Sequence, residues 1–320
     1  MAAFARSAPC WVDVQLPDLE AGKRFYGELF GWTFRPGEGP YADAFSGGRL
    51  VAALVAKQDG RMPTAWGVYF ATDDIVASVA RIREAGGTVI TDPAWVGRAG
   101  VVAQAADPGG AVFGLWQAGE REGFEKRNEP VSFCWTEVHT RQKDRVDAFY
   151  EEVFGFQGTD LDVSDTSTSG PDVPGPDVPG TSSTSHASDA GGFEGTESGS
   201  TESESTESES AGPTAAESGS TASGTDFRMW SPEGTEPGPD TAIGGRSVIS
   251  GAFPAELPSY FLIYFAVEDC NTTAGHAVRL GGRITAPPFD IPYGRMAVLQ
   301  DDQGAVFAVL QPVVSGKRAE

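Results

Sequence analysis

Apolar and polar residues alternate along residues 12–16, near the beginning of the chain. Neighbouring side chains of a strand point to opposite faces, so this alternation predicts a half-buried strand. One face carries the apolar residues Val12, Val14 and Leu16. The other face carries Trp11, Asp13 and Gln15. These side chains point away from the core that the apolar face is expected to join, so they must contact another part of the protein or a ligand.

Residues 17–31 instead show the period of an amphipathic helix. Asp18 is a candidate N-cap, and Gly31 ends the pattern as glycine commonly does at a helix C-terminus. The apolar positions on one side of this helix are Phe25, Tyr26, Leu29 and Phe30. By the same criteria a second helix is predicted over residues 73–87.

Strands are predicted around these helices. Apolar runs occupy residues 48–56 and 65–71, and residues 100–117 contain two runs joined by Asp-Pro-Gly-Gly, which indicates a hairpin. The segments 93–100 and 287–295, each with an aromatic residue and an arginine, are expected to be loops beside a cleft. Helices covering one face of a mostly antiparallel sheet predict an α+β fold.

The sequence contains two copies of this pattern. Trp11 and Trp135 are 124 residues apart, and other matched residues nearby keep the same spacing. Farther along, the spacing is 195 residues, as between the Tyr-Phe-Ala triplets at 69–71 and 264–266. The difference between the two spacings, 71 residues, indicates an insertion within the second copy.

The inserted segment is rich in Ser, Thr, Gly, Pro and Glu, and it carries 14 of the acidic residues between Asp160 and Asp226. Such a composition buries too little apolar surface to offset the entropy of ordering, so disorder is predicted. The predicted organisation is a first module at 1–119, a linker at 120–130, and a second module at 131–314 interrupted at about 160–226.

The chain carries 23 Lys and Arg against 45 Asp and Glu, a net charge of −22, which disfavours nucleic acid and anionic membranes as partners. We see no apolar run of signal-peptide length at the N-terminus and no run of ~18 apolar residues, so a cytoplasmic protein is expected. The three cysteines, Cys10, Cys134 and Cys270, are predicted to be reduced and buried.

Three motifs in the first copy carry a family resemblance: P-D-x-E-x-x-x-x-F-Y-x-E-x-F-G at 17–31, Y-F-A-x-x-D at 69–74, and D-P-x-G-A-V-F at 107–113. The chain resembles the vicinal oxygen chelate superfamily, in particular tandem glyoxalase and bleomycin-resistance-like proteins. The resemblance implies two tandem βαβββ-type modules that form a U-shaped, mostly antiparallel sheet around a cavity, with the helices on the outer face.

Metal-dependent members of that superfamily hold a divalent metal with His, Glu or Gln at three places in each module. Carried over residue by residue, those places fall on Trp11, Gly67 and Gly114, and on Trp135, Leu262 and Ala308. None of these side chains is a metal ligand. We therefore expect no metal and no other cofactor.

The leading hypothesis is an aromatic cleft, built by both copies, that binds a small organic molecule through apolar walls and a few polar anchors. The residues expected to line it are Trp11, Asp13, Gln15, Tyr69, Trp116, Trp135, Glu137, His139 and Tyr264.

Two alternatives remain open at the level of sequence. In the first, the protein is an enzyme of hydroxylase, isomerase or lyase type, with Glu137 and His139 or Asp13 as the acid and base. In the second, it is an interaction protein that recruits a partner through the acidic insertion. Each hypothesis is compatible with a homodimer. A purely structural interpretation also remains open, in which Trp11 and Trp135 fill the cleft and leave no pocket.

Overall fold

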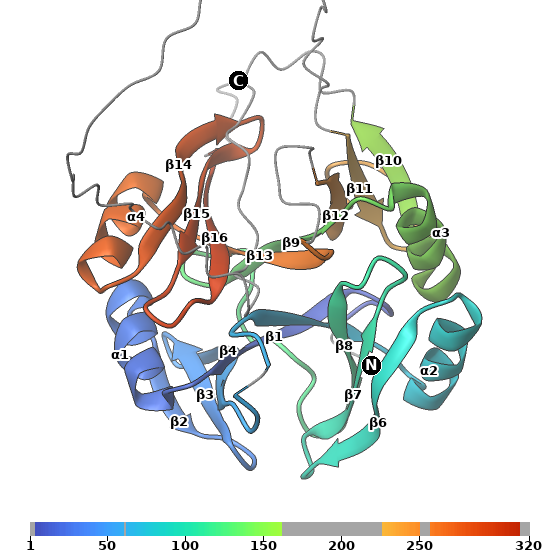
Figure 1. Ribbon diagram of the computed structural model, residues 1–320, viewed down its shortest axis with the longest axis horizontal. Helices are drawn as coiled ribbons and strands as arrows, with labels where there is room; N and C mark the ends of the chain where they lie inside the picture. The colour runs from blue at the N-terminus through green and yellow to red at the C-terminus, as the bar shows by residue number, and fades with distance from the viewer. Residues whose placement is uncertain (1–3, 61, 162–225, 250–256, 314–320) are drawn as a thin grey trace, which may run out of the picture. The chain divides into compact units, whose positions relative to one another are not determined.

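The computed structural model describes residues 4–60, 62–161, 226–249 and 257–313. The expected insertion therefore lies almost entirely outside the described residues. The described chain folds into two eight-stranded sheets and four helices (Figure 1). This is the α+β arrangement of tandem modules that the repeat predicts, and each module forms a sheet of its own.

The first module contains two successive βαβββ units in one sheet, with strand order β2-β3-β4-β1-β5-β8-β7-β6. Five of its seven strand pairs are antiparallel, while β1–β4 and β5–β8 are parallel. Its elements are β1 (Pro9–Leu16), α1 (Leu19–Phe30), β2 (Thr33–Pro36), β3 (Tyr41–Ser46), β4 (Arg49–Ala56), β5 (Trp66–Ala71), α2 (Ile75–Glu84), β6 (Thr88–Val96), β7 (Gly100–Ala106) and β8 (Val112–Ala118).

The second module repeats this topology with strand order β10-β11-β12-β9-β13-β16-β15-β14. Its elements are β9 (Phe133–Thr140), α3 (Lys143–Phe154), β10 (Gln157–Leu161), β11 (Phe227–Ser231), β12 (Gly244–Val248), β13 (Tyr260–Ala266), α4 (Cys270–Arg279), β14 (Arg283–Ile291), β15 (Gly294–Gln300) and β16 (Val306–Pro312).

The helix ends follow the local sequence. Asp18 accepts hydrogen bonds from the backbone N–H groups of Glu20 and Ala21, which caps α1. Gly31 ends the same helix in the left-handed conformation, with φ of 67°, where a side chain would be strained. Asp74 caps α2 in the same way as Asp18 caps α1. The capping signals read from the sequence are thus confirmed.

The segments expected to be loops beside the cleft are parts of hairpins instead. Residues 93–100 form the end of β6, the turn and the start of β7, and residues 287–295 do the same between β14 and β15. Trp95 in the first hairpin is 76% exposed, so it lies on the surface rather than in a core.

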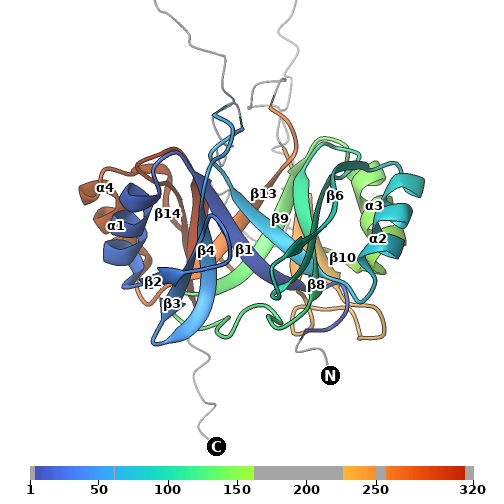
Figure 2. The same cartoon turned by 90° about the horizontal axis from the view of Figure 1, so that it is seen from below.

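The helices lie on the outside of the sheets, and helices of different modules are neighbours (Figures 1 and 2). Helix α1 contacts α4, and α2 contacts α3. Their apolar faces share one core with the helix-facing residues of both sheets.

Two reciprocal hydrogen bonds join the modules within this core. Tyr26 of the first module donates to Asp301 of the second at 2.8 Å, and Tyr150 of the second donates to Asp107 of the first at 3.2 Å. Each aspartate stands in the turn before the last strand of its module. Burial raises the pKa of Asp107 to about 6 and also raises the pKa of Asp301. Each turn therefore depends on a helix of the other module for one of its hydrogen bonds.

The insertion joins two strands that pair with each other. Leu161 at the end of β10 is opposite Phe227 at the start of β11, just as Pro36 is opposite Ala42 in the first module, where residues 37–40 make the connection. In the second module, β10 and β11 are therefore paired up to the ends that the insertion connects.

We predict that replacing residues 162–225 with the first module's Gly-Glu-Gly-Pro loop leaves the fold intact. Shortening a connection between strands that are already paired lowers the entropy cost of closing it, which corresponds to a gain of up to about 2 kcal/mol. Urea unfolding of both proteins measures the difference, and a four-residue Gly-Ser loop is the matched control. The prediction would be contradicted if each of the two shortened proteins had a lower free energy of unfolding than the full chain.

Candidate functional site

The face of the first sheet that carries Trp11, Asp13 and Gln15 is called here the inner face of module one. The strand register brings Trp11 opposite Tyr69 and Asp13 opposite Gly67. Tyr69 is in turn opposite Gly114 on the neighbouring strand β8. These contacts gather an acidic group, a phenol and two glycines from three adjacent strands.

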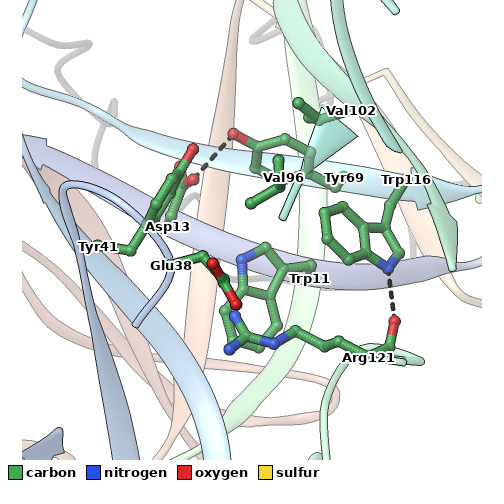
Figure 3. Close-up of a pocket in the computed structure, with 9 residues that line it drawn as sticks. All are labelled: Trp11, Asp13, Glu38, Tyr41, Tyr69, Val96, Val102, Trp116 and Arg121. Atoms are coloured by element: carbon green, nitrogen blue, oxygen red, sulfur yellow. Dashed lines mark hydrogen bonds between the residues drawn. The ribbon is translucent and has the colours of Figure 1, made fainter. Parts of the chain in front are cut away.

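Asp13 and Tyr69 form a buried hydrogen-bonded pair at the centre of this face (Figure 3). The Tyr69 hydroxyl donates to Asp13 Oδ2 at 2.8 Å, and Asp13 is only 4% exposed. Burial raises the pKa of the Asp13 carboxyl to about 7, although the hydrogen bond from Tyr69 lowers it. Burial and the neighbouring Asp13 charge hold the pKa of Tyr69 well above its ordinary value.

Two glycines make room for this pair. A Cβ atom at Gly114 would lie 2.0 Å from the ring of Tyr69, so the ring occupies the space that a side chain there would need. A Cβ atom at Gly67 would lie 3.4 Å from Asp13 Oδ1. Both glycines occupy positions that the family resemblance assigns to metal ligands, and the carboxyl and the phenol lie over them instead.

Two cavities meet at the Asp13–Tyr69 pair. The small cavity, of about 20 Å³, lies toward Trp11, Trp116 and Arg121 (Figure 3). The large cavity, of about 380 Å³, extends along Gln15, Gly67 and Gly114 and reaches residues 258–262 of module two. Most of its lining side chains are apolar or aromatic, and those that bring a carboxyl, amide or serine hydroxyl group are Asp13, Gln15, Gln104 and Ser259.

Arg121 closes one end of the small cavity. It is held by a two-pronged ion pair with Asp43, and its guanidinium lies over the Trp11 ring at 5.3 Å from the ring centre. Trp116 donates from its indole N–H to the backbone oxygen of Arg121 at 3.0 Å. The Arg121 side chain is thus held by interactions within the protein, and it forms part of the cavity wall.

The second module has the corresponding carboxylate and phenol in a different setting. Tyr264 donates to Glu137, and His139 Nε2 lies 3.0 Å from the same carboxylate. The His139 ring stacks on Tyr260 with 4.8 Å between ring centres. Leu262 and Ala308 replace the two glycines, and apolar side chains of this face pack together into a second core cluster.

The nine residues expected in one cleft are therefore divided between two modules. Five of them border the cavities of module one: Trp11, Asp13, Gln15, Tyr69 and Trp116. The other four, Trp135, Glu137, His139 and Tyr264, lie in module two and line neither of these cavities. Glu137 and His139 do lie together, as their spacing on one strand predicts.

Sequence reasoning missed two residues of the site. Gln104 lies in β7 and hydrogen-bonds to Tyr69, on the side away from Asp13's strand. A single polar residue within the apolar run Gly100–Ala106 was its available signal. Arg121 lies in the segment assigned to the linker, where charged residues are ordinary, and nothing in the local pattern singled it out.

The donor atoms of the site do not fit a metal of the kind that the resemblance implies. The six corresponding positions hold tryptophan, glycine, leucine and alanine. Within the described residues, no three His, Cys, Asp or Glu side chains come together as a potential metal site.

The cysteines are free thiols, and Cys10 and Cys134 donate to the backbone oxygens of Tyr69 and Tyr264. Among the described helices, none combines the length and the apolar character that a membrane span requires.

The sequence is similar to known proteins along nearly all its length. It is 32% identical over 329 residues to the anthracycline biosynthesis protein DnrV of Streptomyces peucetius, covering 97% of this chain and 95% of that protein. It is 30% identical over 318 residues to CFP32 of Mycobacterium tuberculosis, which carries the provisional name of a glyoxylase, covering 97% and 96%.

Solved structures share the fold at lower identity. The Mn(II)-bound glyoxalase from Novosphingobium aromaticivorans superposes with a TM-score of 0.55 at 15% identity, covering 96% of this chain and 83% of that one. For 2,2',3-trihydroxybiphenyl 1,2-dioxygenase from Sphingomonas wittichii strain RW1 the TM-score is 0.52 at 11% identity, with coverages of 96% and 91%.

The model of the Glyoxalase/Bleomycin resistance protein/Dioxygenase superfamily matches residues 10–115 and again residues 135–309. These two ranges correspond to the two modules of the structure. Both modules carry the βαβββ units and the turn motifs on which the resemblance depends. The chain therefore belongs to the Glyoxalase/Bleomycin resistance protein/Dioxygenase superfamily.

Proposed function

We propose that the protein binds a small, largely apolar organic molecule in the large cavity, which module one lines together with residues 258–262 and Val306 of module two, without a metal. The observation that carries this proposal is a cavity of about 380 Å³ built around the buried Asp13–Tyr69 pair. Its size falls within the range of small-molecule sites, and a few polar groups among apolar walls are typical of them.

The expected ligand is planar and carries at least one polar group. Tyr69 and Tyr260 contribute aromatic rings to its lining and Leu262 an apolar side chain, and aromatic faces bind flat molecules well. Asp13 and Gln15 stand side by side on one strand face, where they can hydrogen-bond to a hydroxyl or carbonyl group. The relative named for anthracycline biosynthesis supports a polycyclic aromatic ligand of this type.

The chemistry of the side chains supports metal-independent binding. The positions that would supply the ligands of a metal carry side chains without a metal-binding atom or no side chain, and the space above two of them is taken by Asp13 and Tyr69. A carboxyl group and a phenol can orient a ligand by hydrogen bonds alone.

Binding of 1,8-dihydroxyanthraquinone, followed by tryptophan fluorescence, tests the proposal. We expect saturable binding by the full chain, and at least a tenfold loss of affinity in Gly67→Leu. Leucine is the residue that module two has at this position, and from Gly67 its side chain would enter the large cavity. Gly238→Leu is the matched control, because a Cβ atom there has no neighbour within 4 Å.

Exhaustive treatment with a chelator should leave the affinity unchanged. Two outcomes would overturn the proposal. One is binding that is equally tight in Gly67→Leu, which would place the ligand elsewhere. The other is binding that disappears with the chelator and returns with added divalent metal.

A further inference from the structure

Asp13 has an unusual position for a carboxyl group that only supports the fold. One oxygen accepts the hydrogen bond from Tyr69, and the other lies beside Gly67, where the cavity begins. In the part of the chain that the structure describes, no Lys or Arg forms an ion pair with it. Burying a carboxyl group without a cation costs free energy. Titratable groups in such unfavourable surroundings are concentrated at functional sites.

The surroundings of Asp13 set its protonation without a metal. The groups that face it are Tyr69 from β5, Tyr41 from β3, Glu38 just before β3, and Arg121 after β8. Arg121 is engaged by Asp43, so its charge is largely satisfied. Burial therefore dominates, and the pKa of Asp13 rises to about 7, which suits a group that both takes and returns a proton near neutral pH.

Gln15 completes the arrangement. It follows Asp13 by two residues on the same strand face and lines the same cavity. Its side-chain amide can donate to a carbonyl oxygen of a bound molecule, while the free oxygen of Asp13 meets a neighbouring carbon. A donor for the oxygen and a base for the adjacent carbon are the two groups that enolisation needs.

We propose that Asp13 transfers protons to and from a carbon adjacent to a ketone in the large cavity, and that the substrates are cyclic or polycyclic ketones. This inference rests on the proposed binding function and adds chemistry to it. Tyr69 is a positioning residue, because it holds the carboxyl and need not touch the substrate.

The step is balanced within the site. The Asp13 carboxylate takes a proton from the carbon next to the carbonyl, and that C–H bond breaks. Its electron pair forms the C=C bond of the enolate, while the carbonyl π pair moves to oxygen, where Gln15 donates a hydrogen bond. The Asp13 carboxylic acid then returns the proton to the same carbon or to the far end of a conjugated system. Nothing is oxidised or reduced.

Hydrogen–deuterium exchange of 2-tetralone in D₂O, followed by NMR with the full-length protein, tests the inference. The wild type should accelerate exchange next to the carbonyl by at least tenfold over Asp13→Asn, and the accelerated rate should rise with pH through about 7. Asp73→Asn, at an exposed position, is the matched control and should exchange as the wild type does. Fluorescence titration with 2-tetralone measures binding separately.

Tyr69→Phe separates positioning from structure. Loss of the hydroxyl group removes the hydrogen bond that lowers the pKa of Asp13, so the midpoint of the pH profile should move upward while exchange persists. An unchanged midpoint would show that Tyr69 does not position the base.

The outcomes separate the two proposals. Binding of 2-tetralone with equal exchange in wild type and Asp13→Asn would overturn the inference and leave the binding function standing. Exchange abolished by Glu137→Gln but not by Asp13→Asn would overturn it in favour of module two. No binding at millimolar 2-tetralone would overturn both for this class of ligand.

Discussion

Replacing Asp13 with asparagine is expected to make the protein more stable at pH 8. The carboxyl is buried and, above its pKa of about 7, must be carried as a charge without a cation. Asparagine fits the same space, can still accept the hydrogen bond from Tyr69, and carries no charge. A pKa difference of about three corresponds to about 4 kcal/mol, which is the upper size of the expected gain.

The sign of the pH dependence follows from the raised pKa. The folded state binds this proton more tightly than the unfolded state, so the stabilisation is complete below pH about 4 and is lost as the pH rises through about 7. Asp107 adds a smaller slope of the same sign, since burial raises its pKa to about 6, and this slope remains in the variant.

Urea unfolding at pH 5 and at pH 8 measures this difference. The wild type should lose more stability between the two values than Asp13→Asn does. Asp73→Asn, at an exposed site, serves again as the control and should follow the wild type. A variant less stable than the wild type at pH 8 would show that the ionised carboxyl is well satisfied. Gain of stability together with loss of exchange would mark Asp13 as a residue kept for chemistry.

The second large effect is expected at Arg246, whose side chain is 2% exposed. It donates from Nε and Nη2 to Asp147 of α3 at 3.1 and 2.9 Å, and from Nη1 to Asp226 at 2.7 Å. Arg246→Ala would leave Asp147, itself only 12% exposed, without this partner. Removing one member of a buried ion pair costs about 3–5 kcal/mol, and we expect the lower end because Asp226 is partly solvated.

Urea unfolding of Arg246→Ala at neutral pH measures this loss. The control is Arg49→Ala, which removes an equally close ion pair with Glu129 that lies in solvent and should change little. Since Arg246 stands next to the first residues after the insertion, its loss should also loosen β11 and increase its amide exchange. Equal effects of the two substitutions would contradict the assignment of a buried network.

The elements with strong local signals were predictable from sequence. Strand β1 alternates between apolar and polar residues from Val12 to Leu16, and α1 has both a capping aspartate and a terminating glycine. The repeat then extended each prediction to the second copy, because every element was expected to recur there at a fixed spacing. These signals come from burial of one face and from backbone geometry, which the sequence carries directly.

The edge strands were not predictable in this way. Strand β6 lies mostly exposed and shows no regular alternation, and its last residues belonged to the segment 93–100 that was expected to be a loop. Strand β2 has only four residues. An edge strand is defined by its hydrogen bonds to one neighbour, and such a partner is not visible in the side-chain pattern.

Part of the site was also predictable. Strand alternation placed Trp11, Asp13 and Gln15 on one face, and they do line the cavities of that face. The division of the site between two sheets depends on which strands pair, and the pairing is a long-range property. The burial of Asp13, and hence its raised pKa, depends on residues as distant as Tyr69 and could not be read from the local pattern.

The reciprocal bonds of Tyr26 with Asp301 and of Tyr150 with Asp107 have a consequence for how such a chain can evolve. Two identical halves would have to change together, because each alteration would appear on both sides of their joint. In a fused duplicate the two halves can change independently. One half can fill its inner face with side chains and serve as a scaffold, while the other keeps a cavity and specialises. The contrast between Leu262 and Gly67 at matched positions is what such a division of labour would leave behind.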